Sequence, residues 1–161
     1  MRATQYVLPY REFRRLHRRA YRAQRAGHYE VCGVLIVKRR PPTHLALTFL
    51  RNHVTQPYSF GLHRSEVAAE RAAARRIGRR VVGIFHSHPV GWPKLGPRDR
   101  KSTGTNMLHL VHDVCAIELK LWRLVYRGRR RRVVEVPLVV QRSPTRLPAN
   151  HGVQRTGTAL S

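Results

Sequence analysis

The apolar segment 81–85 and the His-Ser-His that follows it constrain the fold of this chain more than any other stretch. The residues VVGIF form the nearly continuous apolar run that is typical of a strand buried on both faces of a sheet. Successive side chains of a strand alternate between its two faces, so His86 and His88 point to the same side and Ser87 points away. The sequence therefore predicts a central strand that brings two imidazoles to one point.

The rest of the chain supplies two helices and five further strands around this one. Apolar residues recur at helical spacing over 10–27 and 65–78, and each stretch includes or ends at a glycine that can stop the helix. Short apolar or alternating runs, separated by turn-forming residues, predict strands. These predicted strands are 31–40, 44–54, 79–86, 108–113, 115–127 and 132–140, with a proline-rich loop over 89–98.

This order of elements, α-β-β-α-β-β-β-β, predicts one α/β domain with a mixed sheet and helices packed against it. We place the domain at residues 1–141. Residues 142–161 are polar, contain proline and glycine, and show no periodicity, so we expect a disordered C-terminal tail. The cysteines, Cys32 and Cys115, lie in apolar runs and are expected to be buried thiols rather than a disulfide.

The chain is strongly basic, with 32 lysine and arginine residues against 8 acidic ones and a formal net charge of +24. Such a charge attracts polyanions over long distances, so association with nucleic acid is one interpretation. All but four of the basic residues are arginines spread over nearly every segment, a pattern that a compositional bias explains equally well. No apolar run approaches 18 residues and no apolar signal segment is present, so we expect a cytoplasmic protein that does not enter the membrane.

Asp99 is the nearest acidic residue downstream of the two histidines, and the ten residues between are enough for the chain to fold back. Two imidazoles and one carboxylate form a three-ligand zinc set that leaves a fourth position open for water, as in catalytic zinc sites. Hydrolysis also needs a carboxylate that accepts and returns a proton. Of the glutamates, Glu30 is the best candidate, because it lies at the junction of the first helix and the next strand.

These residues resemble the JAMM (MPN+/JAB) family of metalloproteases. The family pattern is a glutamate ahead of a small apolar strand, then His-x-His, seven residues, serine, two residues and aspartate. The chain carries "EVCGVLIV", "GIFHSHP" and "GPRD" in this order, and the similarity extends from about Tyr6 to Gln141. It implies a single MPN (JAB)-like domain with cytidine-deaminase-like layering, Glu30 as the catalytic glutamate, and zinc ligands His86, His88 and Asp99.

One position differs from the family pattern, because Gly96 occupies the place of the serine. In the family, that hydroxyl is thought to help hold the oxyanion of the tetrahedral intermediate. The glycine predicts reduced activity without loss of the metal. His109 and His112 are three apart in a predicted strand, so they face opposite sides and are poor metal co-ligands. Trp92 is left open as a substrate-contacting lip or a loop anchor.

The resemblance implies a zinc-dependent peptidase or isopeptidase that acts at the C-terminal Gly-Gly end of a ubiquitin-like or sulfur-carrier protein. Two alternatives remain. Gly96 is compatible with a catalytically weak, metal-binding interaction module. The net charge is compatible with a nucleic-acid-associated protein.

Overall fold

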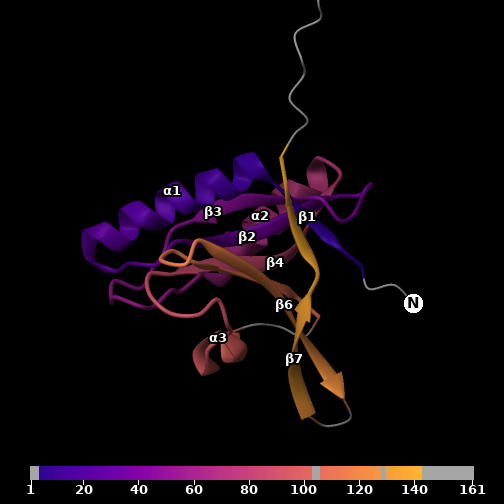
Figure 1. Ribbon diagram of the computed structural model, residues 1–161. Coiled ribbons are helices and arrows are strands. Elements are labelled where there is room, and N and C mark those ends of the chain that lie inside the picture. The colour runs from indigo at the N-terminus through magenta and orange to yellow at the C-terminus, as the bar shows by residue number, and fades with distance from the viewer. Residues whose placement is uncertain (1–3, 103–105, 128–129, 143–161) are drawn as a thin grey trace, which may run out of the picture.

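The computed structural model describes residues 4–102, 106–127 and 130–142, and its centre is a six-stranded sheet in the order β3-β2-β4-β5-β6-β7 (Figure 1). The strands β4 and β5 are parallel and the other neighbouring pairs are antiparallel, so the predicted mixed sheet is confirmed. The strands of this sheet are β2 (Cys32–Lys38), β3 (Leu45–Leu50), β4 (Arg79–His88), β5 (Leu108–Asp113), β6 (Glu118–Arg127) and β7 (Arg130–Val136).

Two short strands outside this sheet pair with each other in parallel, namely β1 (Tyr6–Pro9) and β8 (Leu138–Gln141). The predicted strand 132–140 is therefore wrong as one element, because β7 ends before Pro137 and β8 joins another sheet. Proline has no N–H for a sheet ladder, and the Pro137 carbonyl accepts a hydrogen bond from the Tyr6 N–H instead. The four-residue β1 was missed because so short a run shows no clear alternation.

The helices are α1 (Tyr10–Gly27), α2 (Arg64–Arg76) and α3 (Pro97–Ser102). The first two agree with the predicted helices to within two residues, whereas α3 was expected to be loop and unassigned chain. Its first residue is Pro97, and proline suits the first helical position because the N–H of that position has no helical partner. The short helix lies in the connection between β4 and β5, which must cross over because these two strands are parallel.

The strand β4 is central, as predicted, and its residues from Gly83 to Ser87 are buried. It pairs with β2 on one side and β5 on the other. Its alternate side chains face two separate layers. Phe85 packs in a cluster with Leu16 of α1, while Ile84 packs in a cluster with Ala74 of α2. The domain thus has three layers, with α1 and α2 on opposite faces of the sheet.

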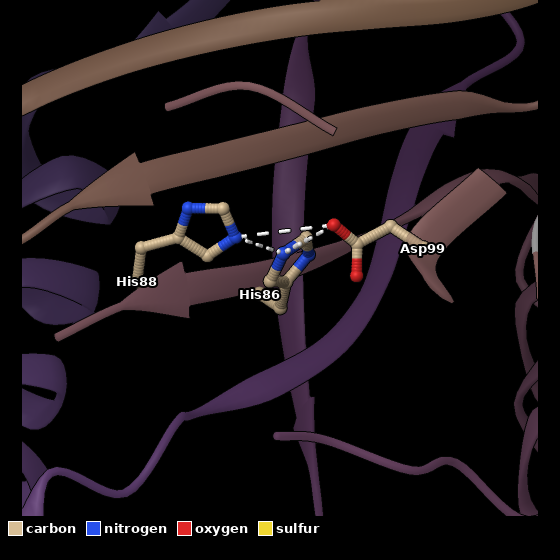
Figure 2. A group of neighbouring side chains, drawn as sticks. All are labelled: His86, His88 and Asp99. Atoms are coloured by element: carbon tan, nitrogen blue, oxygen red, sulfur yellow. Dashed lines mark hydrogen bonds and ion pairs between the residues drawn. The ribbon is translucent and has the colours of Figure 1, made fainter. Parts of the chain in front are cut away.

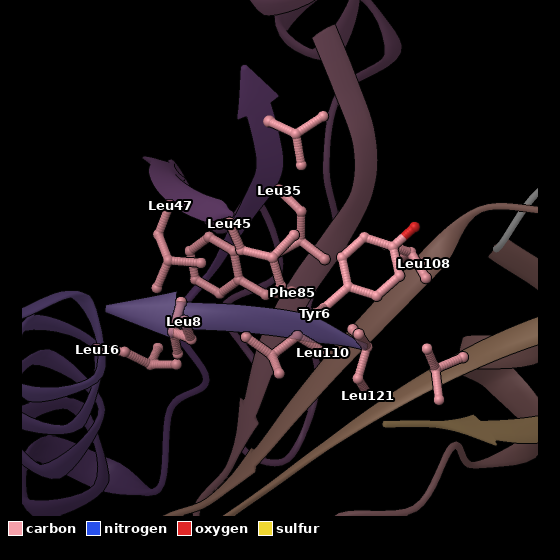
Figure 3. Packing of buried hydrophobic residues seen from close by; sticks show 12 residues of the cluster. Tyr6, Leu8, Leu16, Leu35, Leu45, Leu47, Phe85, Leu108, Leu110 and Leu121 are labelled. Carbon is pink, nitrogen blue, oxygen red and sulfur yellow. The ribbon is translucent and has the colours of Figure 1, made fainter. Parts of the chain in front are cut away.

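The larger core lies on the α1 face, where leucines from β1, β2, β3, β5 and β6 pack around Phe85 (Figure 3). Leu35, Leu110 and Phe85 are fully buried there. Each large apolar side chain contributes about 1.5–3 kcal/mol when it leaves water completely. This packing fixes β4 between its neighbours, and with it the position of the residues at the end of β4.

The structure bears on several smaller expectations. Both cysteines are free, but Cys115 is exposed rather than buried, because it lies in the turn between β5 and β6. The strand predicted over 115–127 begins at Glu118. The strand β8 ends at Gln141, and residues 143–161 lie outside the described residues, so the disordered tail stays a prediction. No helix in the described part of the chain is long and apolar enough to span a membrane.

Candidate metal centre

The side chains of His86, His88 and Asp99 converge at the C-terminal end of β4 (Figure 2). The two histidine Nε2 atoms are 2.8 Å apart. Asp99, in the first turn of α3, places Oδ2 at 3.6 Å from Nε2 of His86 and 3.9 Å from Nε2 of His88. All three potential ligand atoms lie within 4.8 Å of one another. The strand and the loop therefore bring together the three predicted ligands, as a set of two nitrogens and one oxygen that suits zinc.

The ring of His88 is oriented by the loop that follows β4. Its Nδ1 lies 2.8 Å from the backbone carbonyl oxygen of Trp92, which also accepts a hydrogen bond from the Lys94 N–H. A carbonyl accepts, so Nδ1 of His88 carries the hydrogen and Nε2 keeps its lone pair toward Asp99. Trp92 thus anchors the site through its backbone carbonyl, and the residue itself is 75% exposed.

The ring of His86 is completely buried and is held by two neighbours. Phe60 stacks on it, with ring centroids 4.3 Å apart and planes 16° from parallel. Nδ1 of His86 lies 3.0 Å from Nε2 of His109 on β5. Burial lowers the pKa of His86 well below its ordinary value, and the nearby His109 and His88 lower it further. The imidazole therefore stays neutral, which is the form that binds a metal.

Sequence reasoning missed the role of His109. It correctly placed His109 and His112 on opposite faces of β5, but His109 lies behind a candidate ligand. Burial lowers the pKa of His109 to about 3, so it is a neutral hydrogen-bond partner for His86. His112, on the α1 face, instead contacts His17, with His17 Nδ1 3.0 Å from His112 Nε2. His109 reaches His86 because β5 lies parallel to β4 in a register that pairs His109 with Ile84. No sequence pattern revealed this register.

Asp99 is held by the turn that precedes it. The backbone N–H of Gly96 donates a hydrogen bond to Oδ2 of Asp99, at 2.7 Å. Burial raises the pKa of Asp99, and the Gly96 hydrogen bond, His88 and Arg100 oppose this rise. A carboxylate in this position gains from a nearby cation, because a metal would offset the cost of burying its charge.

Gly96 itself does not need the conformational freedom of glycine. Among the described glycines, positive φ angles occur at Gly27, Gly78 and Gly91, and not at Gly96. A Cβ atom built on Gly96 would lie 3.2 Å from Oδ2 of Asp99. The backbone at Gly96 is thus compatible with the serine of the family pattern. The space for its Cβ atom is limited by the carboxylate end of the Asp99 side chain.

Glu30 lies just before β2, and its side chain is buried near Asp99, one of the three candidate metal ligands. It is 7% exposed, and its Oε2 has no hydrogen-bond partner among the residues that the structure describes. Burial raises the pKa of Glu30 to about 8, with a further increase from the charge of Asp99. Together they line a small cavity of about 110 Å³. The other lining residues are Tyr58, Ser59, Phe60 and Arg98.

Ser87 and Asn52 fix the backbone on each side of Glu30. The Ser87 hydroxyl accepts a hydrogen bond from the Val31 N–H at 3.0 Å, and the Ser87 N–H donates to the Val31 carbonyl at 2.9 Å. The Asn52 side-chain amide donates to the Glu30 carbonyl at 3.0 Å. Ser87 therefore points away from the histidines, as predicted, and ties the residue after Glu30 to the strand that carries both histidines.

The arrangement of strands and helices is shared with solved structures, one of which is a JAB1/MPN domain protein. A protein from Desulfitobacterium hafniense matches with a TM-score of 0.71 and 19% identity over 86% of this chain and 94% of its own. A JAB1/MPN domain protein from Archaeoglobus fulgidus matches with a TM-score of 0.50 and 17% identity, over 84% of this chain and 99% of its own. A protein from Salinibacter ruber matches with a TM-score of 0.53 and 18% identity, over 80% of this chain and 87% of its own.

The family model for prokaryotic homologs of the JAB domain matches residues 13–125, which is more than half of the chain. The chain belongs to this family, which includes metal-dependent isopeptidases and whose members typically bind zinc. No curated protein gives a significant match. The predicted family and fold class are confirmed.

Proposed function

We propose that this protein is a zinc-dependent peptidase or isopeptidase that cleaves after the C-terminal Gly-Gly of a ubiquitin-like or sulfur-carrier protein. The observation that carries the proposal is the carboxyl group of Glu30. It is buried, its Oε2 has no partner within the described part of the chain, and it shares one cavity with Asp99. A buried carboxyl group without a partner costs free energy, and such costs are typical of active sites.

In this proposal His86, His88 and Asp99 hold the zinc ion, and the donor set fits it. The three ligand atoms converge, and both rings are oriented by partners on their other nitrogen atoms. Zinc, when bound, supplies a Lewis acid that lets water act as a nucleophile near neutral pH.

Glu30 performs the proton transfers. Its carboxylate accepts a proton from the attacking water and returns it to the leaving amine, as general acid–base catalysis requires. Burial raises its pKa to about 8, which makes its carboxylate a stronger base than that of an exposed glutamate. A positive charge held by the neighbouring ligands would favour the carboxylate form and so lower this pKa.

The size of the cavity favours a substrate with small residues at the scissile bond. A volume of about 110 Å³ admits a glycine backbone and leaves little room for side chains beyond it. Phe60 and Tyr58 give the walls an apolar and aromatic character, as is usual for binding sites. Phe60 also lines a larger cavity of about 350 Å³, but Glu30 and Asp99 line only the smaller one, so we place the reaction there.

Cleavage of a carrier fusion tests the proposal. The substrate is a ubiquitin-like sulfur carrier that ends in Gly-Gly and is extended by a short peptide, with products identified by mass spectrometry. We expect cleavage after the second glycine, loss of cleavage with a chelator, and recovery with zinc. A substrate with alanine in place of the last glycine should be cleaved at least tenfold more slowly, because the added methyl group must fit the narrow cavity.

A second candidate function follows from Gly96. If the folded, zinc-loaded protein cleaves neither a carrier fusion nor an isopeptide-linked carrier, the metal-binding interaction module is the better description. In that case the carrier should bind without being processed. The Glu30→Gln variant serves as the matched control, since it preserves the size of the side chain and removes the base.

A further inference from the structure

The outer face of α1 carries a continuous row of arginines. At 100° per residue, Arg11, Arg14, Arg18, Arg22 and Arg25 fall within an arc of about 80° on the helix. All five are exposed, and at 1.5 Å per residue they extend over about 21 Å. The opposite face, with Leu16 and Ala20, is completely buried against the sheet. We call these five arginines the arginine ridge.

Within the described part of the chain, acidic residues do not neutralise the ridge. The sole acidic residue of α1 is Glu12, which is 9% exposed and lies toward the core. It pairs with Arg15 at 2.7 Å and with Arg11 at 3.9 Å, and it also accepts a hydrogen bond from the Leu47 N–H. Among the described residues, no other ion pair involves α1. The remaining four arginines of the ridge therefore present their full charge to solvent.

This pattern differs from that of the other long helix. In α2, Glu66 and Glu70 are interspersed with the arginines, and Glu66 also pairs with His53 at 2.9 Å. The mixture of signs on α2 is what a solvated helix face usually shows. The arginine ridge on α1 instead carries only positive charges in one straight row, an arrangement that suits a linear, negatively charged polymer.

The surroundings of the ridge distinguish between anionic partners. Insertion into a membrane needs an exposed apolar face, whereas the apolar face of α1 is buried. Docking of an acidic protein needs an apolar core within the interface, and Tyr21 is the one large apolar side chain that α1 exposes. Contacts to a nucleic-acid backbone need neither, because arginines bind phosphate oxygens directly.

We propose that the arginine ridge of α1 binds the phosphate backbone of double-stranded nucleic acid without regard to sequence. Over about 21 Å, a duplex of DNA presents about twelve phosphates on its two strands, of which a straight ridge can reach several. Arg142, whose guanidinium lies 4.8 Å from the Tyr10 ring, places one more cation at the N-terminal end of α1. This inference is independent of the proposed peptidase function, since no ridge residue belongs to the metal centre.

The salt dependence of DNA binding tests this proposal on the full chain. The probe is a 24-base-pair duplex of arbitrary sequence, and the variant combines Arg14→Gln, Arg18→Gln and Arg22→Gln. Each lost phosphate contact lowers the slope of log Kobs against log[salt] by about 0.9, so the slope should fall by roughly 3. Glutamine is nearly as good a helix former as arginine, so the melting temperature and the zinc content should be unchanged.

A second triple variant controls for net charge. Arg75→Gln, Arg76→Gln and Arg80→Gln remove the same charge from exposed positions outside α1, and this variant should keep the slope within about 1 of wild type. Equal losses in both variants would overturn the proposal, because binding would then follow the net charge. The proposal would also be overturned if polyglutamate competed with the duplex as strongly as unlabelled DNA does. The same holds if the protein bound vesicles of anionic lipid and the ridge variant lost that binding as completely as it lost DNA binding.

Discussion

The imidazole of His109 lies 3.0 Å from that of the candidate zinc ligand His86, joined through Nε2 of His109 and Nδ1 of His86. This contact fixes which nitrogen of His86 faces Asp99. We expect His109→Leu to weaken zinc binding by about 10–100-fold, because partners behind a ligand commonly contribute that much. His109→Gln, whose amide oxygen can accept the same hydrogen bond, should retain most of the affinity. Competition with a chromophoric zinc chelator measures both, and equal affinity in wild type and His109→Leu would contradict the assignment.

Ser87 should affect Glu30 rather than the metal. Its hydroxyl is buried and accepts a hydrogen bond from the Val31 N–H, next to Glu30. Ser87→Ala leaves that N–H without a partner, which costs about 1–3 kcal/mol of unfolding free energy. We expect a lower kcat with unchanged zinc content, measured by peptide cleavage, urea unfolding and elemental analysis. Loss of zinc in this variant would show that Ser87 positions the histidines instead.

The buried His112 predicts a loss of stability in mild acid. Burial lowers the pKa of His112 from 6.5 to about 4, with His17 lowering it further and the carbonyl of Glu118 opposing this. Between these two pH values the unfolded chain binds a proton that the folded chain does not, so stability falls as pH falls from 6.5 toward 4. The full effect is roughly 3 kcal/mol and is already complete below pH 4.

The variant His112→Gln isolates this effect, because it removes the titrating group. Urea unfolding of both proteins at several pH values between 4 and 7 gives the difference in unfolding free energy. We expect the unfolding free energy of wild type, relative to that of the variant, to fall as pH falls. Wild type loses the contribution of neutral His112, which the variant does not have. A difference that is independent of pH would mean that His112 does not titrate between these values.

Gly96→Ser should raise kcat. A missing oxyanion donor typically costs about 10²–10³ in rate, so a restored hydroxyl is expected to give at least a tenfold gain with little change in KM. The φ angle of Gly96 is not left-handed, and the added Cβ would require Oδ2 of Asp99 to shift by a few tenths of an ångström. Kinetics and melting temperature are measured on the same sample. An unchanged or lower kcat in a folded, zinc-loaded variant would show that another donor is already in place.

Much of the candidate site was predictable because it depends on local chain geometry. His86 and His88 project to one side because β4 is a regular strand, and the loop after them is long enough to return Asp99. The position of Glu30 beside them followed from the family resemblance, since local sequence placed it no nearer than an element junction. Its burial against Asp99 depends on the pairing of β2 with β4.

What sequence could not predict depends on long-range pairing. His109 reaches His86 because β5 lies parallel to β4 in one particular register. Phe60 stacks on His86 from the connection between β3 and α2, a segment without periodicity. The parallel pair of β1 and β8 joins residues about 130 positions apart in two four-residue strands. In each case the partner is chosen by tertiary packing, which no local pattern encodes.

The measurement that tests the central claim most directly is the zinc content of wild type, His86→Ala, Asp99→Ala and Glu30→Gln, by elemental analysis after dialysis against metal-free buffer. A site reduced to two protein ligands binds zinc far more weakly. We therefore predict about one zinc per chain in wild type and Glu30→Gln, with little in His86→Ala or Asp99→Ala. Full occupancy in both ligand variants, or a wild-type protein that binds no zinc when folded and supplied with it, would contradict the proposed metal centre.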